Sequence, residues 1–278
     1  MKIIEWNINQ RAKHLDSKII PTFISSAILE EDPDFFVLTE FYQVEELERF
    51  KKSLSEYQIF TTENSQHHQN DVCIGVKNTY TDVQIASLME SRRENPFPNF
   101  LHLLVELDNM TLSLMGVRIR IPAHQDIAVS TEESQRYRLD QFCHLESYIA
   151  YIQEPAILVG DFNNYRRGHS PATMAMLKGE TPEQCDIFNM HILSERANAL
   201  GYEMCTPEGF SWGKDNENVK YQFAQDHAFI KGVTITHQSY EDEFMKYAPE
   251  IYEEQGIRGV ATPYPDHKML VTEFEINS

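Results

Sequence analysis

The sequence predicts a single α/β (α+β) domain built around a mixed β-sheet, and three observations lead to this prediction. Short apolar runs rich in branched residues recur along the chain, with amphipathic helical stretches between them. Several later runs are joined by tight turns, as at residues 107–110, which suits antiparallel hairpins. The chain has 278 residues, of which 41% are hydrophobic, so one large core can form.

The expected elements alternate along the chain. Strands are expected where short apolar runs end at polar or turn-forming residues, at 2–8, 34–40, 57–62, 71–76, 101–107, 111–121, 156–160, 226–236 and 268–275. Helices are expected where apolar residues follow three- and four-residue spacing, at 17–30, 44–54, 134–152 and 189–200, the last ending at Gly201. Residues 237–262 are acidic and lie between two strands, so we expect a surface insertion within one domain covering 1–278.

The composition argues against several classes of protein. The chain opens directly into a strand-like run, so we expect no signal peptide, and no apolar run reaches the length of a membrane span. The four cysteines are widely spaced and form no Cys-x-x-Cys pair, which favours reduced thiols over zinc or redox chemistry. We therefore expect a cytoplasmic globular protein that does not bind membranes, and nothing in the sequence indicates an obligate protein partner.

The charge bears on the substrate. A formal net charge of −19 argues against broad electrostatic attraction to nucleic acid, so a polyanion would have to be captured locally. Arginines do occur in close pairs, which match phosphate oxygens well but are as readily surface ion-pair partners of the many acids. The pairs are Arg92 with Arg93, Arg118 with Arg120, Arg136 with Arg138, and Arg166 with Arg167.

Polar residues gather where the expected strands begin or end, which is where a sheet-based enzyme builds its site. Each cluster has an ordinary explanation, such as a turn former, an exposed carboxylate or a satisfied histidine. Chance accounts less easily for all of them in one chain. The clusters are Trp6-Asn7-Ile8-Asn9, Leu38-Thr39-Glu40, Arg118-Ile119-Arg120, Gly160-Asp161-Phe162-Asn163-Asn164 and Pro265-Asp266-His267.

This ordered set, together with Gln225-Asp226-His227, resembles the motifs of the endonuclease/exonuclease/phosphatase (DNase I-like) superfamily. The resemblance runs from Asn7 to His267, and its most specific part is Gly-Asp-Phe-Asn followed by the late Asp-His. It implies a four-layer α/β/β/α sandwich of two packed mixed β-sheets flanked by helices. It also implies hydrolysis of phosphodiesters or phosphomonoesters with Mg²⁺ or Mn²⁺.

The resemblance and the chemistry of the side chains together assign roles. Glu40, Asp266 and Asn9 are the expected metal ligands, because magnesium prefers oxygen atoms; the position of Asn9 is often Asp in the superfamily, so its neutrality lowers the charge around the metal. His267 is expected to be catalytic with Asp226 as its partner, beside Asp161, Asn163 and Asn7. The sequence leaves open whether Asp161 or His267 removes the proton of the attacking water.

The clearest departure from the superfamily lies in the middle strand. Where many members carry His or Tyr to serve the leaving group, this chain has Arg118 or, one register on, Arg120. Arginine stays charged and is a poor proton donor, although it can bind phosphate or stabilise an oxyanion. We expect Arg118 to be catalytic, and Arg120, Arg138 and Asn164 to bind the substrate phosphate.

Three functions are consistent with these residues. The first is a divalent-metal-dependent phosphodiester hydrolase, in its most specific form a nuclease. The second is a phosphomonoesterase acting on a small nucleotide, sugar or inositol phosphate, which a closed, arginine-lined pocket would favour over an open groove. The third is a non-catalytic binding module with the same fold, which is disfavoured because the proposed catalytic residues all occur together.

Overall fold

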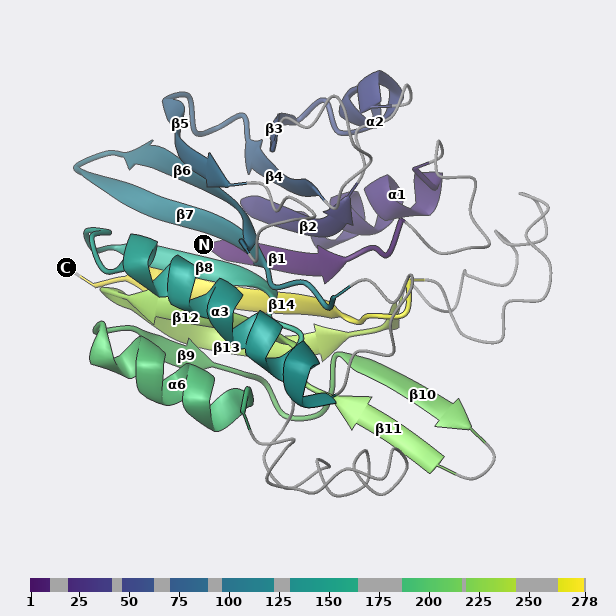
Figure 1. Ribbon diagram of the computed structural model, residues 1–278. Helices are drawn as coiled ribbons and strands as arrows, with labels where there is room; N and C mark the ends of the chain where they lie inside the picture. The colour runs from purple at the N-terminus through teal and green to yellow at the C-terminus, as the bar shows by residue number, and fades with distance from the viewer. Residues whose placement is uncertain are drawn as a thin grey trace.

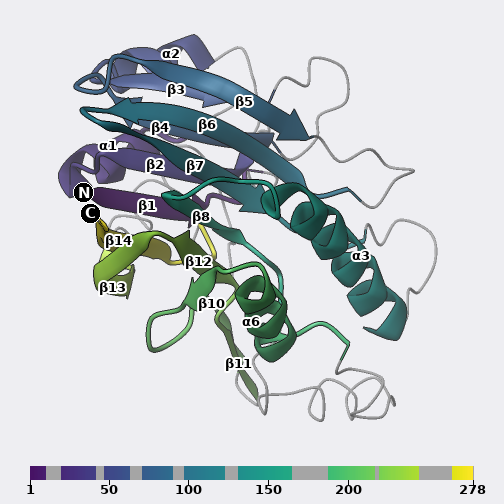
Figure 2. The same cartoon turned by 90° about the vertical axis from the view of Figure 1, so that its left-hand side faces the viewer.

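Two six-stranded β-sheets pack face to face, and helices cover the outer face of each (Figures 1 and 2). The computed structural model describes residues 1–10, 20–41, 47–62, 71–89, 97–122, 131–164, 187–216, 219–243 and 265–277. The predicted four-layer α/β/β/α sandwich is therefore confirmed.

The first sheet contains both ends of the described chain, and β1 and β2 are its parallel pair. The other pairs of neighbouring strands in this sheet are antiparallel. In order across the sheet the strands are β13 (Val233–Glu241), β14 (Met269–Ile276), β1 (Lys2–Asn7), β2 (Phe35–Phe41), β4 (Asp71–Lys77) and β3 (Tyr57–Thr61).

The second sheet has the same mixed character, with β7 and β8 as its parallel pair. Its strands, in order, are β5 (Val83–Met89), β6 (Asn99–Leu107), β7 (Met110–Arg118), β8 (Ala156–Asp161), β12 (Asp226–Lys231) and β9 (Glu203–Cys205). A separate hairpin of β10 (Trp212–Asn216) and β11 (Val219–Phe223) extends from this half of the molecule (Figure 1).

Three apolar layers hold the four structural layers together. Helices α1 (Thr22–Glu31) and α2 (Leu47–Ser53) bury residues such as Ile24 and Phe50 against the first sheet. Residues such as Val37 and Leu114 fill the space between the sheets. Helices α3 (Thr131–Ile149) and α6 (Met190–Ala199) cover the second sheet. Alternation along each strand sends successive side chains into different layers.

The structure corrects several predicted boundaries. Strands β5, β9, β10 and β11 were not expected; β5 lies at a sheet edge and is largely exposed, so it lacks a continuous apolar pattern. The expected strand 226–236 is two strands, separated by Gly232 at φ 65°. The strand expected at 111–121 ends at Arg118. Helix α6 ends before Gly201, which has the left-handed φ of 82° expected of a helix-terminating glycine.

The surface insertion expected at 237–262 begins later than predicted. Residues up to Glu241 belong to β13 and pair with β14, because the strand continues in register after a bulge. Residues 244–262 lie outside the described part, so the remainder of the insertion stays a prediction. The single-domain prediction for 1–278 is likewise untested.

Two further observations concern the described residues alone. Among the helices of the described ranges, none is both long enough and apolar enough to cross a membrane. Cys73 is buried, whereas Cys143 and Cys205 are partly exposed.

Candidate active site

The site lies between the two sheets, where both parallel strand pairs end. Asn7 ends β1 and Glu40 lies near the end of β2, while Arg118 and Asp161 are opposite each other at the ends of β7 and β8. Asp226 begins β12, which runs antiparallel to β8, and so lies opposite Asp161. The carboxyl ends of parallel strands are a recurring position for binding sites in α/β sheets.

Strand alternation directs the central side chains into the space between the sheets. Ile157 and Val159 of β8 belong to the inter-sheet core, and Asp161 continues that face. Arg118 follows Leu112 and Leu114 of β7 in the same way. The β7 strand places Arg118 in the site, and Arg120 lies beyond the strand end.

Gly160 permits the close approach of β8 to β7 beside Asp161. A Cβ atom at Gly160 would lie 1.9 Å from the carbonyl oxygen of Val117 and 2.7 Å from its carbonyl carbon. The contacted atoms are backbone, so they cannot move aside as a flexible side chain would. The glycine of the Gly-Asp-Phe-Asn run is thus required by strand packing.

Three of the site residues have left-handed backbone conformations. The φ angles are 39° at Asn9, 51° at Glu40 and 45° at Asn163, and this region is uncommon for residues with a side chain. At Glu40 the pairing of β2 with β4 also shifts in register between Leu38 and Phe41. Regular alternation would place Glu40 on the face of Leu38; the bulge and the left-handed φ bring it to Asn7 and Arg118 instead.

Both carboxylate oxygens of Asp161 accept hydrogen bonds from other residues of the site. Asp161 is fully buried. Its Oδ2 accepts from Asn7 Nδ2 at 2.9 Å and from Asn163 Nδ2 at 2.8 Å. Its Oδ1 accepts from the backbone N–H of Asn163 at 2.8 Å. Both oxygens are therefore oriented by the loop that follows β8 and by the end of β1.

Arg118 joins the two sheets through an ion pair with Glu40, to which its Nη2 donates. Its Nε is 3.8 Å from Asp161 Oδ2. Arg118 is only 5% exposed, yet its Nε and Nη1 have no hydrogen-bond partner within the described part of the chain. Buried guanidinium donors without a partner are costly, and an anionic substrate oxygen would satisfy them.

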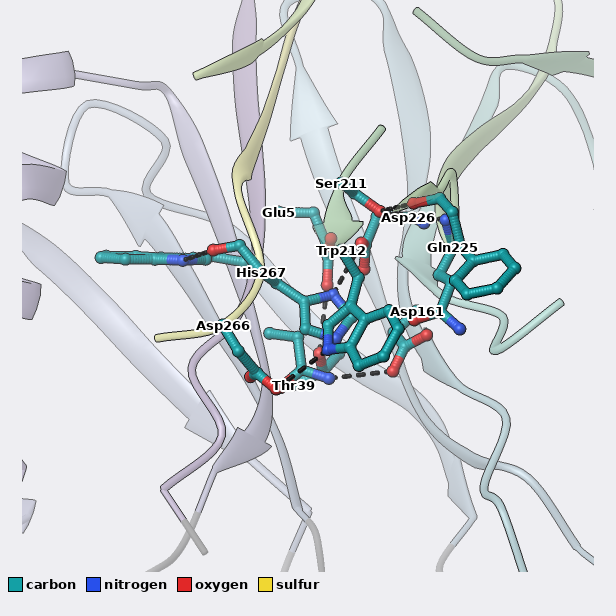
Figure 3. A network of polar contacts seen from close by, with 12 residues as sticks. Glu5, Thr39, Asp161, Ser211, Trp212, Gln225, Asp226, Asp266 and His267 are labelled. Atoms are coloured by element: carbon teal, nitrogen blue, oxygen red, sulfur yellow. Dashed lines mark hydrogen bonds and ion pairs between the residues drawn. The ribbon is translucent and has the colours of Figure 1, made fainter. Parts of the chain in front are cut away.

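His267 pairs with Asp226 at the entrance to β14. His267 Nδ1 and Asp226 Oδ2 are 2.8 Å apart, and both side chains are buried (Figure 3). Burial lowers the pKa of His267, but the charge and hydrogen bond of Asp226 and the charges of Asp161 and Asp266 outweigh it and raise the pKa to about 10. The backbone carbonyl of His267 also accepts from Trp6 Nε1 at 3.1 Å, which fixes the loop.

Asp266 is held from two directions. Asn9 Nδ2 donates to its Oδ1 at 2.9 Å, and Trp212 Nε1 donates to its Oδ2 at 2.9 Å. Trp212 also forms an isolated bridge with His267, so the β10–β11 hairpin is attached to the site. These contacts place Asp266 beside Asn9, and the role of the two residues as metal ligands stays a prediction.

The chemistry of these side chains fits a divalent cation. In the described ranges no three His, Cys, Asp or Glu side chains come together closely enough to hold an ion. Magnesium does not require them, since one or two carboxylates with waters and substrate oxygens suffice. The site nevertheless contains more acidic than basic side chains. The acidic ones are Glu40, Asp161, Asp226 and Asp266, and the basic ones are Arg118 and His267. Glu40, Asp266 and the amide oxygen of Asn9 could supply the protein ligands.

The architecture is shared with solved structures, although no protein-family model and no curated protein matches this sequence. D. rerio TDP2, complexed with a single-strand DNA product, is 15% identical with a TM-score of 0.60, covering 99% of this chain and 98% of that one. An endonuclease/exonuclease/phosphatase protein from Beutenbergia cavernae is 12% identical with a TM-score of 0.64, covering 100% of this chain and 72% of that one. The chain has the DNase I-like fold.

A third DNase I-like structure is the endonuclease domain of TRAS1, a telomere-specific non-LTR retrotransposon. It is 12% identical to this chain with a TM-score of 0.56, covering 100% of this chain and 98% of that domain. At such identities the likeness concerns the fold, which is the fold that the sequence motifs implied.

Within the DNase I-like framework, two residues expected to bind phosphate have other contacts. Arg138 is 1% exposed; its Nη1 donates to the backbone carbonyl of Asn163 and its Nε to that of Ser134 at 3.1 Å. Asn164 is fully buried; its Nδ2 donates to the carbonyl of Ala224 at 3.3 Å, and its Oδ1 is 2.8 Å from His227 Nε2. These contacts favour a role in holding the loop after β8 over direct contact with substrate.

Arg120 and Asn163 also make contacts that the sequence did not predict, and the expected phosphate contact of Arg120 stays a prediction. The backbone N–H and carbonyl of Arg120 bond to the side chain of Gln141, which fixes the chain just after β7. Asn163 Nδ2 donates to the carbonyl of Ile119 at 2.7 Å as well as to Asp161. Asn163 therefore orients Asp161 here, and its expected donation to a substrate oxygen stays a prediction. The pairs Arg92–Arg93 and Arg166–Arg167 lie outside the described residues, and Arg136 pairs with Glu132 on the surface.

The sequence did not indicate several supporting residues. Ser211 Oγ accepts from the backbone N–H of Gln225 at 2.9 Å and of Asp226 at 3.3 Å, so it fixes the start of β12. Trp212 holds Asp266, and nothing in the local sequence marks it except that tryptophan is scarce in the chain. Glu5 could have been recognised, because a charged residue in the apolar run Ile3-Ile4-Glu5-Trp6 shares the strand face of Asn7.

The pKa of Asp161 leads to a stability prediction. Burial raises this pKa to about 7, with a further increase from the charge of Asp226 and opposing effects of His267 and Arg118. By comparison, an aspartate in the unfolded chain has a pKa of about 4. Each pKa unit of difference between the folded and unfolded chain corresponds to about 1.4 kcal/mol of free energy. Protonated Asp161 therefore contributes fully to the free energy of unfolding below the pKa of the unfolded chain. This contribution is lost as the pH rises through the folded pKa of about 7.

Asp161→Asn is therefore expected to gain stability relative to wild type as pH rises from 5 to 8. Thermal unfolding in the presence of a chelator measures this difference, with Asp140→Asn on the exposed face of α3 as the control. A difference between Asp161→Asn and wild type that did not change with pH would contradict the assigned pKa.

Proposed function

We propose that this protein is a divalent-metal-dependent phosphodiester hydrolase that cleaves nucleic acid. The observation that carries the proposal is the convergence of a buried Asp161, oriented through both oxygens, with the His267–Asp226 pair and the unsatisfied donors of Arg118. The site thereby offers a base, a cation for the phosphoryl group and an oriented histidine, which is a recognised arrangement for hydrolysis.

Asp161 is the base in this proposal. A general base works best when its pKa is near the operating pH, and burial brings the pKa of Asp161 to about 7. Asn7 and Asn163 hold its oxygens in place. Asp161 would orient the attacking water and take its proton as the water oxygen attacks the phosphorus atom.

Arg118 and His267 serve the phosphoryl group. The Nε and Nη1 donors of Arg118, which have no hydrogen-bond acceptor among the described residues, would bind non-bridging oxygens, where negative charge accumulates. His267, kept protonated by Asp226, would add a second positive charge. Because arginine does not give up a proton, the leaving oxygen is stabilised here by charge and hydrogen bonds.

Glu40, Asp266 and Asn9 would hold the metal ion, which when bound polarises a phosphoryl oxygen and offsets charge on the leaving oxygen. The ion pair of Glu40 with Arg118 then connects the metal ligands to the phosphate-binding donors. Asn9 and Trp212 keep Asp266 oriented toward the same edge.

Nucleic acid is the favoured substrate class because two proteins of the same fold act on it. D. rerio TDP2 was solved with a single-strand DNA product, and the TRAS1 domain is an endonuclease. The net charge of −19 opposes extended duplex binding, which depends on counterion release. A single strand or strand end captured at the site agrees with both observations.

Initial rates on a substrate panel test the proposal. The panel contains single-stranded DNA, duplex DNA, RNA, dinucleotides, inositol phosphates and a generic phosphodiester, each with Mg²⁺, with Mn²⁺ and with a chelator. Metal-dependent cleavage of the single strand or of dinucleotides supports the proposal. Turnover confined to phosphomonoesters would identify a phosphatase instead, and no metal-dependent turnover on any substrate would favour a binding module.

A further inference from the structure

Glu5 is a buried carboxyl group in the polar network that contains the Asp226–His267 pair. It lies on β1, two residues before Asn7, and its side chain faces the second sheet like those of Ile3 and Asn7. It is 0% exposed. Figure 3 shows Glu5 within the network that contains Thr39, Asp226 and His267.

Each of the two carboxyl groups, Glu5 and Asp226, has one oxygen whose partner is known and one that is unsatisfied. Glu5 Oε1 accepts from Thr39 Oγ1 at 3.1 Å, and Asp226 Oδ2 faces His267 Nδ1 at 2.8 Å. Glu5 Oε2 and Asp226 Oδ1 are buried and have no hydrogen-bond donor among the residues that the structure describes. A buried oxygen left without a donor is destabilising, and more so if it is charged.

The two unsatisfied oxygens belong to neighbouring groups, since the charge of Asp226 is, after burial, the main cause that raises the pKa of Glu5. If both groups were ionised, two negative charges would meet in a buried environment of low dielectric constant, and neither could donate. One shared proton resolves both defects, since a protonated carboxyl is a donor. This is the general behaviour of paired carboxyl groups in a low-dielectric site.

We propose that Glu5 carries a proton on Oε2 and donates it to Asp226 Oδ1, which makes Glu5 a positioning residue for the Asp226–His267 pair. The hydrogen bonds then run from Thr39 through Glu5 and Asp226 to His267. Asp226 is then the acceptor of two hydrogen bonds, one from Glu5 and one from His267. Both of its oxygens are fixed, so the carboxylate cannot rotate away from His267 Nδ1.

The charges around Glu5 agree with this assignment. Burial raises the pKa of Glu5 well above its ordinary value, and the charges of Asp226 and Asp161 and the hydrogen bond with Asp226 raise it further. Only the hydrogen bond from Thr39 opposes them. Among the described residues, the acidic neighbours Asp226 and Asp161 thus both raise the pKa of Glu5.

The test compares two substitutions of Glu5. Glu5→Gln keeps the shape and supplies an amide N–H to Asp226 Oδ1, whereas Glu5→Leu removes the donor while keeping the bulk. The catalytic part of the test rests on the proposed function: Glu5→Gln is expected to retain wild-type kcat, and Glu5→Leu to lose about 10–100-fold in kcat, as partners of this kind typically do, with little change in KM.

A second readout needs no substrate. The infrared difference between wild type and Glu5→Gln at neutral pH is expected to contain the carbonyl band of a protonated carboxyl. A difference containing only ionised carboxylate bands would overturn the proposal, as would a Glu5→Gln variant that loses as much kcat as Glu5→Leu. If the wild type cleaves no phosphoester, the proposed function fails and the infrared band alone decides the role of Glu5.

Discussion

Replacing His267 with alanine is expected to lower kcat for phosphoester cleavage by about 10²–10⁴-fold. The imidazole is buried, 2.8 Å from Asp226, and charged at neutral pH because the neighbouring carboxylates raise its pKa. The substitution removes a positive charge beside the phosphoryl group. It also leaves Asp226 as a buried charge without its cation. Because these interactions strengthen as charge builds up, kcat should fall more than the affinity for substrate.

The matched control is His237→Ala, since His237 is exposed on β13 and has no part in the site. Steady-state kinetics on the best substrate of the panel compares both variants with wild type. A His267→Ala enzyme with the kcat of the control would remove His267 from the catalytic residues.

The second large effect is expected for Glu40→Gln, which should weaken Mn²⁺ binding by about 10–100-fold or more, as changes to metal sites do. The substitution removes the negative charge at the proposed metal position while keeping the size of the side chain. It also removes the ion pair to Arg118, so a loss of kcat should remain even at saturating metal.

Calorimetric titration with Mn²⁺ measures the change in affinity directly, and Glu30→Gln on the exposed side of α1 is the control. Unaltered Mn²⁺ affinity in Glu40→Gln would show that the metal binds elsewhere. Rates that high metal concentrations restore in full would contradict the additional role of the Glu40–Arg118 pair.

Much of this architecture was predictable because strand alternation and motif order are local properties. The apolar run before Asp161 predicted a strand at 156–160, which is β8, and in the structure the alternation of this strand turns Asp161 to the inner face. The run of Asn7, Glu40, Asp161, Asp226 and His267 at strand ends predicted that these residues meet, and they do. Parallel pairing made this possible, since both pairs end at the same edge.

The features that escaped prediction depend on contacts between distant segments. Alternation alone would have turned Glu40 to the outer face, and only the bulge against β4 reverses it. The choice between Arg118 and Arg120 depended on where β7 ends. Arg138 suggested a phosphate contact, but its Nη1 donates to the backbone carbonyl of Asn163 after β8. Edge strands such as β5 leave a weak pattern because few of their side chains are buried.

The most direct test of the central claim is the metal-dependent initial rate of Asp161→Ala beside Asp140→Ala and wild type, measured on single-stranded DNA and the generic phosphodiester. Asp161 receives hydrogen bonds from Asn7 and Asn163 and lies opposite Arg118, so it is central to the site. We expect Asp161→Ala to lose at least about 10²-fold in rate while Asp140→Ala keeps the wild-type rate. Full activity in a folded Asp161→Ala protein would contradict the proposed site.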